Sequence, residues 1–542
     1  MKTTRFLRLL RFLAVLLGGC QIGSTAQAQQ LNTIGVTLLR IVVTNADGTG
    51  IRVAQPEAWT TNDPPDFEVN PANSSVQQSA GLLTYIGTNG TTNIFPNSLG
   101  VESGHADDVA ANFYGLPGGV ATNVVHVDNY DANYFYDSII VATFPPNIND
   151  RVVNQSFIFG YVPGQVTVSQ QRQLDSQFDN YAAQYNTLFV SGAGNGGPGS
   201  GTVAPPSTCY NGLSVGAYGY AYSSVGPTED NGRAKPDITA PAGATSFSTP
   251  QVTGAAAVLM QTSLRGDGGS NTNSATDMRT TKALLLNGAV KPADWTNNPP
   301  SPFDPRYGAG ILNVFNSYEQ LAGGEHGYIA ATSVPSGGAH PPNGATGTIE
   351  ALNGWDFNTN TSANTSDEIY HYYFNVTNGF GKDPFAATAT LVWNRQLNQT
   401  NINNLNLFLY NAANSNLVAC STSLVDNVEQ IFVPNLAPAR YDLQVWKAAG
   451  TVGIGGTAVS HSETYALAWG FLSTSLNAAQ SGGNLLLSWP IYPDGFVLAS
   501  ASSLTPPVVW NTNNPAPMVT NNLNQVLINA TNAGQFFRLQ PP

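Results

Sequence analysis

The sequence predicts an α/β fold whose first domain is a doubly wound parallel sheet, followed by an all-β sandwich and a small C-terminal β module. Strand-like and helix-like segments alternate from about residue 31 to 320, whereas short strands separated by Asn, Gly and Pro turns follow residue 325. The chain has 542 residues, which is too long for one hydrophobic core. We therefore expect domains over residues 29–325, 326–471 and 472–542, after a leader over residues 1–28.

In the first domain, apolar runs of strand length are separated by longer helical patterns. Strands are expected at residues 50–54, 152–157, 187–190 and 212–217, and helices at residues 107–114, 169–185 and 249–262. Such alternation is typical of a parallel sheet with helices on both faces.

The remainder of the chain shows the period of two that is typical of strands. Leu405, Leu407 and Leu409 alternate with neighbours that would face the other way. Further strands are expected at residues 388–393, 427–433, 441–446, 485–489, 495–498 and 535–539. Short strands with frequent turns predict a β-sandwich, and the last three segments predict a separate small module.

The N-terminus has the three parts of a secretory signal peptide. Basic residues from Lys2 to Arg11 precede the apolar run 12–17, and Ala26-Gln-Ala28 offers a small-x-small cleavage site. The apolar run is too short to span a bilayer, so we expect a secreted protein. Leu17-Gly-Gly-Cys20 also resembles a lipoprotein box, which leaves open an anchored form at the cell surface or in the periplasm.

Charge and cysteine usage narrow the expected partners. The formal net charge of −13 gives the chain no electrostatic reason to bind nucleic acid or anionic lipid. Cys209 and Cys420 lie in different predicted domains, so free buried thiols are favoured while a bridge between them stays open. The sequence shows no metal-ligand spacing and no dense acidic loop, so no cofactor is expected and a structural calcium is left without support.

A small-residue turn and helix carry the strongest chemical signal. The segment Ala244-Thr-Ser-Phe-Ser-Thr-Pro-Gln-Val-Thr-Gly254 places Ser246 just ahead of a helix, where its hydroxyl faces the positive helix end. An ordinary alanine-rich core helix does not explain the preceding run Lys235-Pro-Asp-Ile-Thr-Ala-Pro241. A serine exposed in this way is a candidate nucleophile for acyl transfer.

These two segments resemble the serine motif of the subtilases, G-T-S-x-[AS]-x-P-x-[AV]-x-G, and the stretch that precedes it. The resemblance covers about residues 40 to 320 and includes Thr281–Asn287 and Arg306–Asn313, which resemble the closing helix and turn of the family. It implies a subtilisin-like fold and a serine endopeptidase with Ser246 as its nucleophile.

The resemblance implies a base and an oxyanion donor. Ser103-Gly-His-Ala-Asp-Asp-Val-Ala110 is similar to the subtilase helix start that carries the base, which assigns that role to His105. We expect Asp107 and Asp108 to cap this helix, and they would raise the pKa of His105 if they lay near it. Val190-Ser-Gly-Ala-Gly-Asn-Gly-Gly197 resembles the segment whose Asn stabilises the oxyanion, here Asn195.

The acid that orients the base differs from the one that the family uses. Subtilases place an Asp at the end of the first core strand, where this sequence has Gln55-Pro-Glu57. Glu57 presents the same carboxylate on a chain one methylene longer and can bond Nδ1 of His105. Asp47 or Asp63 remains an alternative, as does the absence of an orienting acid.

Substrate contacts also follow from the resemblance. The strand of Val152-Val-Asn-Gln-Ser-Phe157 looks like the family strand that forms one wall of the S1 pocket and pairs with the substrate backbone. This resemblance implies substrate contacts by Asn154, Gln155, Ser156 and Phe157. Ile158 and Phe159 stand where the family has small residues, which predicts a narrower or more apolar subsite.

The later strands resemble the jelly-roll domain that follows the peptidase domain in some subtilases. Such domains stabilise the enzyme or bind surfaces, so the expected partners are polypeptide substrates, with cell-surface or polysaccharide contacts by the C-terminal β domains left open.

Two functions remain open from the sequence. The first is an active secreted serine endopeptidase that uses Glu57, His105 and Ser246 and forms an acyl-enzyme. The second is a catalytically inactive binding protein with the same fold, since Glu57 takes the place of the family's Asp and the segment between Pro241 and Ser246 is short. A lipase would need a Gly-x-Ser-x-Gly elbow around its serine, and a sedolisin would have Asp in place of Asn195.

Overall fold

The computed structural model describes residues 24–61, 63–160, 165–377, 383–450, 459–481, 484–520, 523–529 and 535–541. Most of the predicted leader, including Cys20, therefore lies outside the described residues. The first helix, α1 (Ser24–Thr33), contains the predicted cleavage site. Within the described ranges, no helix is both long and apolar enough to cross a membrane.

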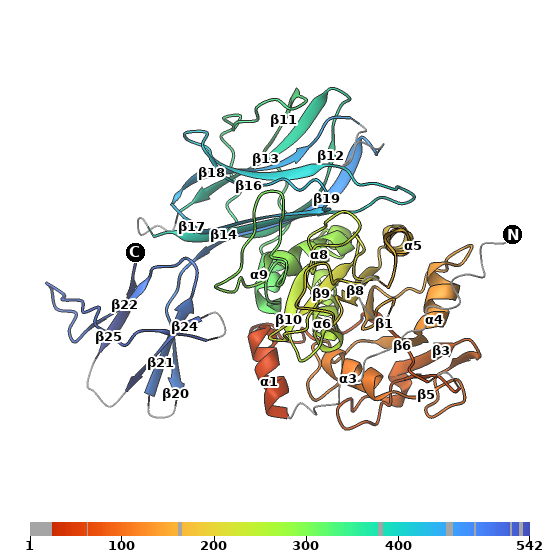
Figure 1. Cartoon of the computed structure of the whole chain (residues 1–542). Helices are drawn as coiled ribbons and strands as arrows, with labels where there is room; N and C mark the ends of the chain where they lie inside the picture. The colour runs from red at the N-terminus through yellow and green to blue at the C-terminus, as the bar shows by residue number, and fades with distance from the viewer. Residues whose placement is uncertain are drawn as a thin grey trace.

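A central sheet of eight strands forms the first part of the molecule (Figure 1). Its order is β10-β9-β8-β7-β1-β6-β3-β4, and its strands are parallel apart from β4, which pairs antiparallel with β3. The bounds are β1 Arg52–Glu57, β3 Leu83–Gly87, β4 Gly90–Thr92, β6 His126–Asp131, β7 Val152–Gln155, β8 Leu188–Gly192, β9 Leu213–Tyr218 and β10 Ile238–Pro241.

The strand order reverses at β1, which has β6 on one side and β7 on the other. The chain first builds the β6-β3-β4 side and then crosses over to build the β7-to-β10 side. In open α/β sheets, the crevice at such a switch point, beyond the carboxyl ends of the strands, is where ligands bind. Glu57 and Gln155 are the last residues of β1 and β7, so this end of the sheet is the expected site.

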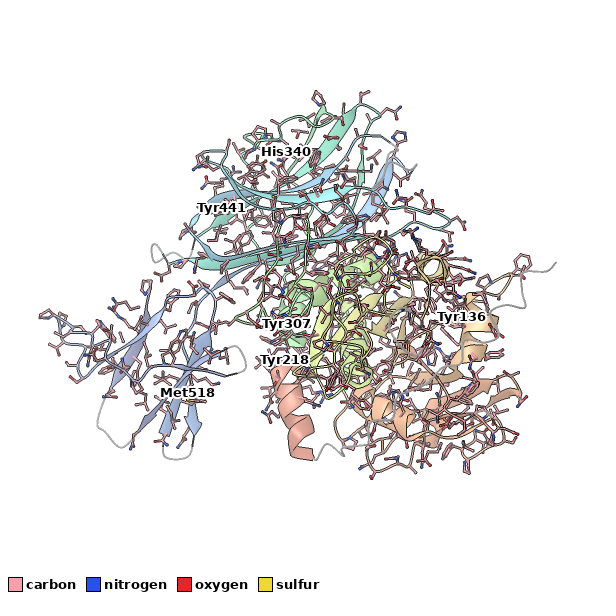
Figure 2. The ribbon with its side chains drawn as sticks, in the orientation of Figure 1. Tyr136, Tyr218, Tyr307, His340, Tyr441 and Met518 are labelled. Atoms are coloured by element: carbon pink, nitrogen blue, oxygen red, sulfur yellow. The ribbon has the colours of Figure 1, made fainter. Side chains whose placement is uncertain are left out.

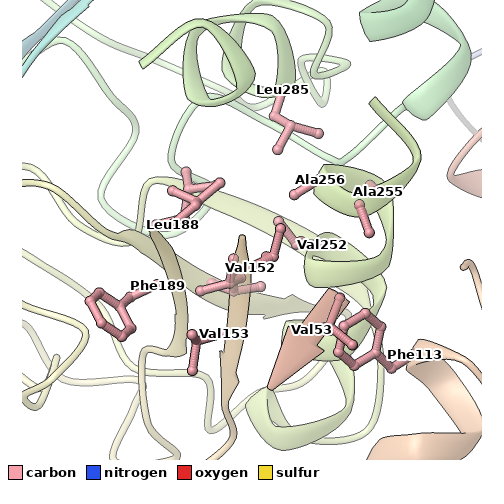
Figure 3. Close-up of a cluster of buried hydrophobic side chains, with 14 of the residues drawn as sticks. Val53, Phe113, Val152, Val153, Leu188, Phe189, Val252, Ala255, Ala256 and Leu285 are labelled. Atoms are coloured by element: carbon pink, nitrogen blue, oxygen red, sulfur yellow. The ribbon is translucent and has the colours of Figure 1, made fainter. Parts of the chain in front are cut away.

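Helices cover both faces of the sheet. Val252 and Ala256 of α6 (Thr245–Leu264) lie beside Val152 in the buried cluster of Figure 3. On the other face, Phe178 of α5 (Val168–Tyr185) meets Phe189 edge-on, with ring centroids 5.2 Å apart. The remaining described helices are α2 (Val36–Val42), α3 (Gly104–Phe113), α4 (Ala132–Tyr134), the π-helix η2 (Phe135–Ile140), α7 (Thr272–Ala275), α8 (Met278–Asn287), α9 (Val314–Ala322) and the 3-10 helix η1 (Ala80–Leu82).

All described strands from β11 onward pair antiparallel. A five-stranded sheet, β11-β13-β18-β15-β16, packs on a four-stranded sheet, β12-β19-β14-β17, around a core that includes Trp393 and Trp469. The bounds are β11 Ala330–Pro335, β12 Asn353–Thr361, β13 Ser366–Val376, β14 Phe385–Trp393, β15 Leu405–Asn411, β16 Leu417–Ser421, β17 Val428–Leu436, β18 Ala439–Lys447 and β19 Ser462–Ser473.

Two further small sheets follow, with their own core around Trp489. They have the orders β20-β21-β24-β23 and β22-β25, and they form the separate blue part of Figure 1. Their bounds are β20 Asn477–Ser481, β21 Asn484–Pro490, β22 Val497–Ala501, β23 Met518–Thr520, β24 Leu523–Asn529 and β25 Phe536–Gln540. The predicted fold class is therefore confirmed, whereas the domain boundaries stay predictions.

The sandwich packs directly on the α/β part. Thr388 and Thr390 of β14 donate hydrogen bonds from their hydroxyls to Asn287 Oδ1 at the end of α8, at 2.9 and 3.0 Å. Val392 and Ala466 belong to the same buried cluster as the helices of the first part. Cys209 and Cys420 are both free thiols.

Candidate active site

Glu57 and His105 meet at the predicted end of the sheet. His105 Nδ1 lies 2.8 Å from Glu57 Oε2. The Glu57 side chain is 1% exposed and the His105 side chain 19%, so the pair sits at the border between interior and solvent. Of the three acids that the sequence left open, Glu57 is the one whose carboxylate contacts the imidazole.

The chain before His105 fixes where its helix begins. Ser103 has extended backbone, and its hydroxyl accepts a hydrogen bond from the N–H of Ala106 at 3.4 Å. Ser103 therefore caps α3, and the expectation that Asp107 and Asp108 supply the cap is wrong. Asp107 is buried and accepts hydrogen bonds from Asn70 N–H and Asn73 Nδ2, each at 2.7 Å. Burial raises the pKa of Asp107 to about 8.

Opposing effects act on the pKa of His105. Burial by itself lowers it, but the charge of Glu57 and the hydrogen bond to Glu57 raise it, with further help from Asp108 and Asp66. The net effect is a pKa above the ordinary value. Because a carboxylate accepts at Nδ1, the neutral ring carries its proton there and leaves Nε2 as the basic nitrogen.

Ser246 is the second residue of α6, which begins four residues earlier than the sequence predicted. The helix follows Ala244, whose backbone is extended, so the chain turns sharply just before the serine. Ser246 Oγ lies 3.5 Å from the carbonyl oxygen of Ser156, and Ser156 Oγ donates to the carbonyl of Ser246 at 2.9 Å. These contacts tie the nucleophile candidate to the chain just beyond β7.

The helix starts of α3 and α6 adjoin each other. The rings of His105 and Phe247 have centroids 5.9 Å apart. In the described part of the chain, however, no hydrogen bond joins Ser246 to His105. The three predicted catalytic residues therefore lie in one region, with one of their two expected contacts formed.

Asn195 lies beside the serine turn. Its Oδ1 accepts hydrogen bonds from the N–H of Thr245 at 3.0 Å and from the Thr245 hydroxyl at 3.1 Å. Both partners are donors, which settles the amide orientation and leaves Nδ2 as the free donor. Asn195 is exposed, so this donor is accessible to a bound ligand.

Two of the predicted substrate-binding residues, Asn154 and Gln155, have side chains that point into the protein interior. Asn154 donates from Nδ2 to Ser156 Oγ at 2.9 Å, and Gln155 Oε1 accepts from a serine hydroxyl of β8 at 2.8 Å. Both side chains are fully buried. Phe157 packs edge-on against Phe159, whose ring also meets Tyr136 (labelled in Figure 2). Contacts of Asn154 and Gln155 with a substrate would therefore come from their backbone, and these roles stay predictions.

Two residues that adjoin the Glu57–His105 pair were not predicted from the sequence. Gln55 donates from Nε2 to Glu57 Oε1 at 2.9 Å, and Tyr114 donates its hydroxyl proton to Gln55 Oε1 at 2.7 Å. The position of Gln55, two residues before Glu57 on the same strand face, was a usable signal. Nothing in the local sequence connects Tyr114 to either residue.

The described residues contain no group of three or more His, Cys, Asp or Glu side chains arranged to hold a metal ion.

A parallel α/β sheet with a carboxylate–imidazole pair and a serine at a helix start, all at one switch point, is the architecture of a serine hydrolase. Residues 80–310 match the subtilase family, the Peptidase_S8 peptidases. The chain therefore contains a subtilase domain, which is the domain of a serine-type endopeptidase. The match contains His105, Asn195 and Ser246 but begins after Glu57.

Solved structures of proteases are also similar to the chain. The patellamide maturation protease PatA is 23% identical, with a TM-score of 0.34 over 51% of this chain and 98% of that chain. The prenylagaramide maturation protease PagA is 19% identical, with a TM-score of 0.36 over 53% and 98%. A serine protease of Aeromonas sobria is 14% identical, with a TM-score of 0.37 over 98% of both chains. The comparison with curated proteins gave no match.

Proposed function

We propose that this protein is a secreted endopeptidase that hydrolyses peptide bonds through an acyl-enzyme formed on Ser246. The observation that carries the proposal is the 2.8 Å contact between Glu57 and His105, beside the helix start that bears Ser246. Glu57 orients the imidazole, His105 acts as general base and then general acid, and Ser246 is the nucleophile.

The reaction requires one movement at the serine. The Ser246 hydroxyl turns from the Ser156 carbonyl toward Nε2 of His105, which takes its proton as Oγ attacks the peptide carbonyl carbon. The imidazolium then protonates the leaving amine, and water hydrolyses the ester in the reverse sequence. Contacts between nucleophile and base are often long before a substrate binds, so the resting position of Ser246 is compatible with this role.

Two donors are available for the negative charge that develops on the peptide oxygen. They are the Nδ2 group of Asn195 and the backbone N–H of Ser246. Removing one such donor typically reduces transition-state stabilisation by about 3 kcal/mol. The hydrogen bonds from Thr245 hold Asn195 in the orientation that this role needs.

A catalytically inactive surface protein is the second candidate. The observation that favours it is the serine hydroxyl, which lies against the Ser156 carbonyl instead of the imidazole. Hydrolysis of an unfolded protein substrate by purified wild type and by the Ser246→Ala variant separates the two functions. Cleavage that disappears with the hydroxyl supports the peptidase, whereas equal cleavage by both, or none by a folded wild type, supports the inactive protein.

Export is proposed from the basic and apolar N-terminal segment. Mass spectrometry of the protein recovered from a bacterial host measures the mature N-terminus. A chain that begins at Gln29 supports release, a lipidated Cys20 supports anchoring, and an intact chain that stays in the cytoplasm contradicts export.

Surface binding by the C-terminal β domains is proposed from an aromatic pair on the sandwich. Tyr328 is 38% exposed and stacks on Tyr370, with ring centroids 3.9 Å apart. Exposed aromatic faces suit the apolar faces of sugar rings. Retention on an insoluble polysaccharide, compared between wild type and Tyr328→Ala, tests this role, and equal retention contradicts it.

A further inference from the structure

Gln55, Glu57, His105 and Tyr114 come from only two elements. Strand β1 carries Gln55 and Glu57 on one face, since they are two residues apart. Helix α3 has His105 in its first turn and is followed directly by Tyr114. Gln55, Glu57 and Tyr114 are all buried. The strand and the helix thus contribute one pair of polar side chains each to a single buried cluster.

The Gln55 side-chain amide makes three hydrogen bonds. Its Nε2 donates both to Glu57 Oε1 at 2.9 Å and to the carbonyl of Ala106 at 3.0 Å, and its Oε1 accepts the Tyr114 hydroxyl at 2.7 Å. Rotating the amide by half a turn would set its oxygen against two acceptors. The two acceptors therefore fix the orientation of the amide, and the Tyr114 hydroxyl, which has no bond to Glu57, holds its oxygen end in place.

The two oxygens of Glu57 consequently have fixed and different roles. Oε1 is held by Gln55, and Oε2 is left for Nδ1 of His105. The same amide holds the carbonyl of Ala106, the residue after His105, so it also ties the first turn of α3 to β1. A glutamate has one more rotatable bond than an aspartate, and this clamp removes that freedom. Burial raises the pKa of Tyr114 well above its ordinary value, so its hydroxyl remains a donor.

We propose that Gln55 and Tyr114 are positioning residues, which hold Glu57 in the one orientation that directs Oε2 at His105. The proposal rests on the proposed peptidase function for its kinetic consequence. Its structural consequence, an ordered hydrogen bond between His105 Nδ1–H and Glu57, is independent of catalysis.

Tyr114→Phe is the decisive variant, because it removes one oxygen and keeps the ring. We expect kcat for a peptide substrate to fall about ten-fold, as for loss of one buried hydrogen bond, with KM unchanged. The expected midpoint of the acidic limb of kcat/KM moves to lower pH, since a loosened carboxylate raises the pKa of His105 less. Gln55→Leu should act in the same direction, and Gln55→Asn, with a shorter amide, should restore little.

Tyr85→Phe is the matched control. Tyr85 is another buried tyrosine, whose hydroxyl donates to the backbone carbonyl of Val69 at 2.8 Å. The Tyr85→Phe variant should lose stability as Tyr114→Phe does. Its kcat and the pH midpoint of its kcat/KM should equal those of wild type. Equal kinetics for the two variants would overturn the positioning role.

Proton NMR separates this inference from the peptidase function. Wild type should show a low-field Nδ1–H resonance that is absent from His105→Ala, and Tyr114→Phe should broaden or remove it while Tyr85→Phe keeps it. If wild type cleaves no peptide but the resonance behaves in this way, the peptidase function fails and the positioning role stands. A resonance that is unchanged in Tyr114→Phe contradicts the positioning role whatever the activity.

Discussion

The carboxylate of Glu57 makes contacts in two directions, and its side-chain length suits both. Glu57→Asp would restore the residue that the subtilase resemblance expects, yet it withdraws the carboxylate by about 1.5 Å from both Gln55 and His105. We predict that kcat falls about 100-fold, the scale of a misplacement of this size. Steady-state kinetics of the folded variant measure it, and activity equal to or above wild type would contradict the account.

The raised pKa of His105 predicts how activity depends on pH. The base must be neutral, so kcat/KM should rise with pH through a midpoint above the ordinary histidine value of about 6.5. Asp108 is exposed and contributes to this rise. Asp108→Asn should therefore move the midpoint to lower pH.

The control for this pH effect is Asp294→Asn, which neutralises an exposed carboxylate that is not among the groups acting on His105. Its midpoint should equal that of wild type. A midpoint for Asp108→Asn that stays in place or moves upward means that the charge of Asp108 does not reach the imidazole.

Short motifs explain which site residues the sequence could predict. His105, Asn195 and Ser246 each lie in a short contiguous motif. The neighbouring residues in each motif form a local structure, such as a turn before a helix, and so can be recognised from the sequence. Glu57 was found because it stands where the subtilase resemblance places an Asp. Tyr114 could not be found, because its partner Gln55 is 59 positions away and the hydrogen bond exists only once β1 and α3 have packed.

At the scale of elements, Gly254 allows the nucleophile helix to approach the chain that follows α3. A Cβ at this position of α6 would lie 2.7 Å from Cβ of Val120. Alanine normally stabilises a helix interior relative to glycine, but here the clash should dominate, and we predict that Gly254→Ala lowers the free energy of unfolding by about 1–3 kcal/mol. Chemical denaturation measures this change.

Gly327→Ala serves as the control, because nothing lies within 4 Å of its Cβ position. The control should stay within about 0.5 kcal/mol of wild type. A Gly254→Ala variant as stable as wild type would show that the two segments do not pack as closely as described.

The sequence predicted whether a segment is a helix or a strand better than it predicted the residues at which the segment begins and ends. The first strand was expected over residues 50–54, and Pro56, a residue type that interrupts most ladders, lies two positions further on. In the structure β1 continues to Glu57, because its pairing with β7 ends at Ala54 and only β6 accompanies it further. The missing N–H of Pro56 therefore leaves no gap on the β7 side, a circumstance that depends on strand order and is invisible in the local sequence.

At the scale of the whole molecule, buried polar contacts join the sandwich to the α/β part. Arg395, after β14, lies 2.7 Å from Asp179 of α5, and both side chains are buried. Asn211 additionally accepts from the N–H of Arg395 and donates to its carbonyl, at 2.7 and 2.9 Å. The period-two pattern and frequent turns predicted the sandwich itself, but these cross-contacts involve residues more than 180 positions apart and could not be predicted.

We predict that Arg395→Met lowers the free energy of unfolding by about 3–5 kcal/mol, because it leaves Asp179 buried without its cation. Asp294→Asn is the control, since Asp294 is exposed and its pair with Arg306 is 47% and 59% exposed, and such pairs contribute about 0–1 kcal/mol. Calorimetry should show one shared transition for both parts in wild type. Two well-separated transitions, or equal effects of the two variants, would contradict the cooperative unfolding of the sandwich and the α/β part as one unit.

The most direct measurement of the central claim is the site of covalent labelling by a fluorophosphonate, read by peptide mass spectrometry. We predict a single adduct on Ser246 in wild type, its loss in Ser246→Ala, and strongly slowed labelling in His105→Ala. A folded wild-type protein that takes up no label, or that carries the label on another residue, would contradict it.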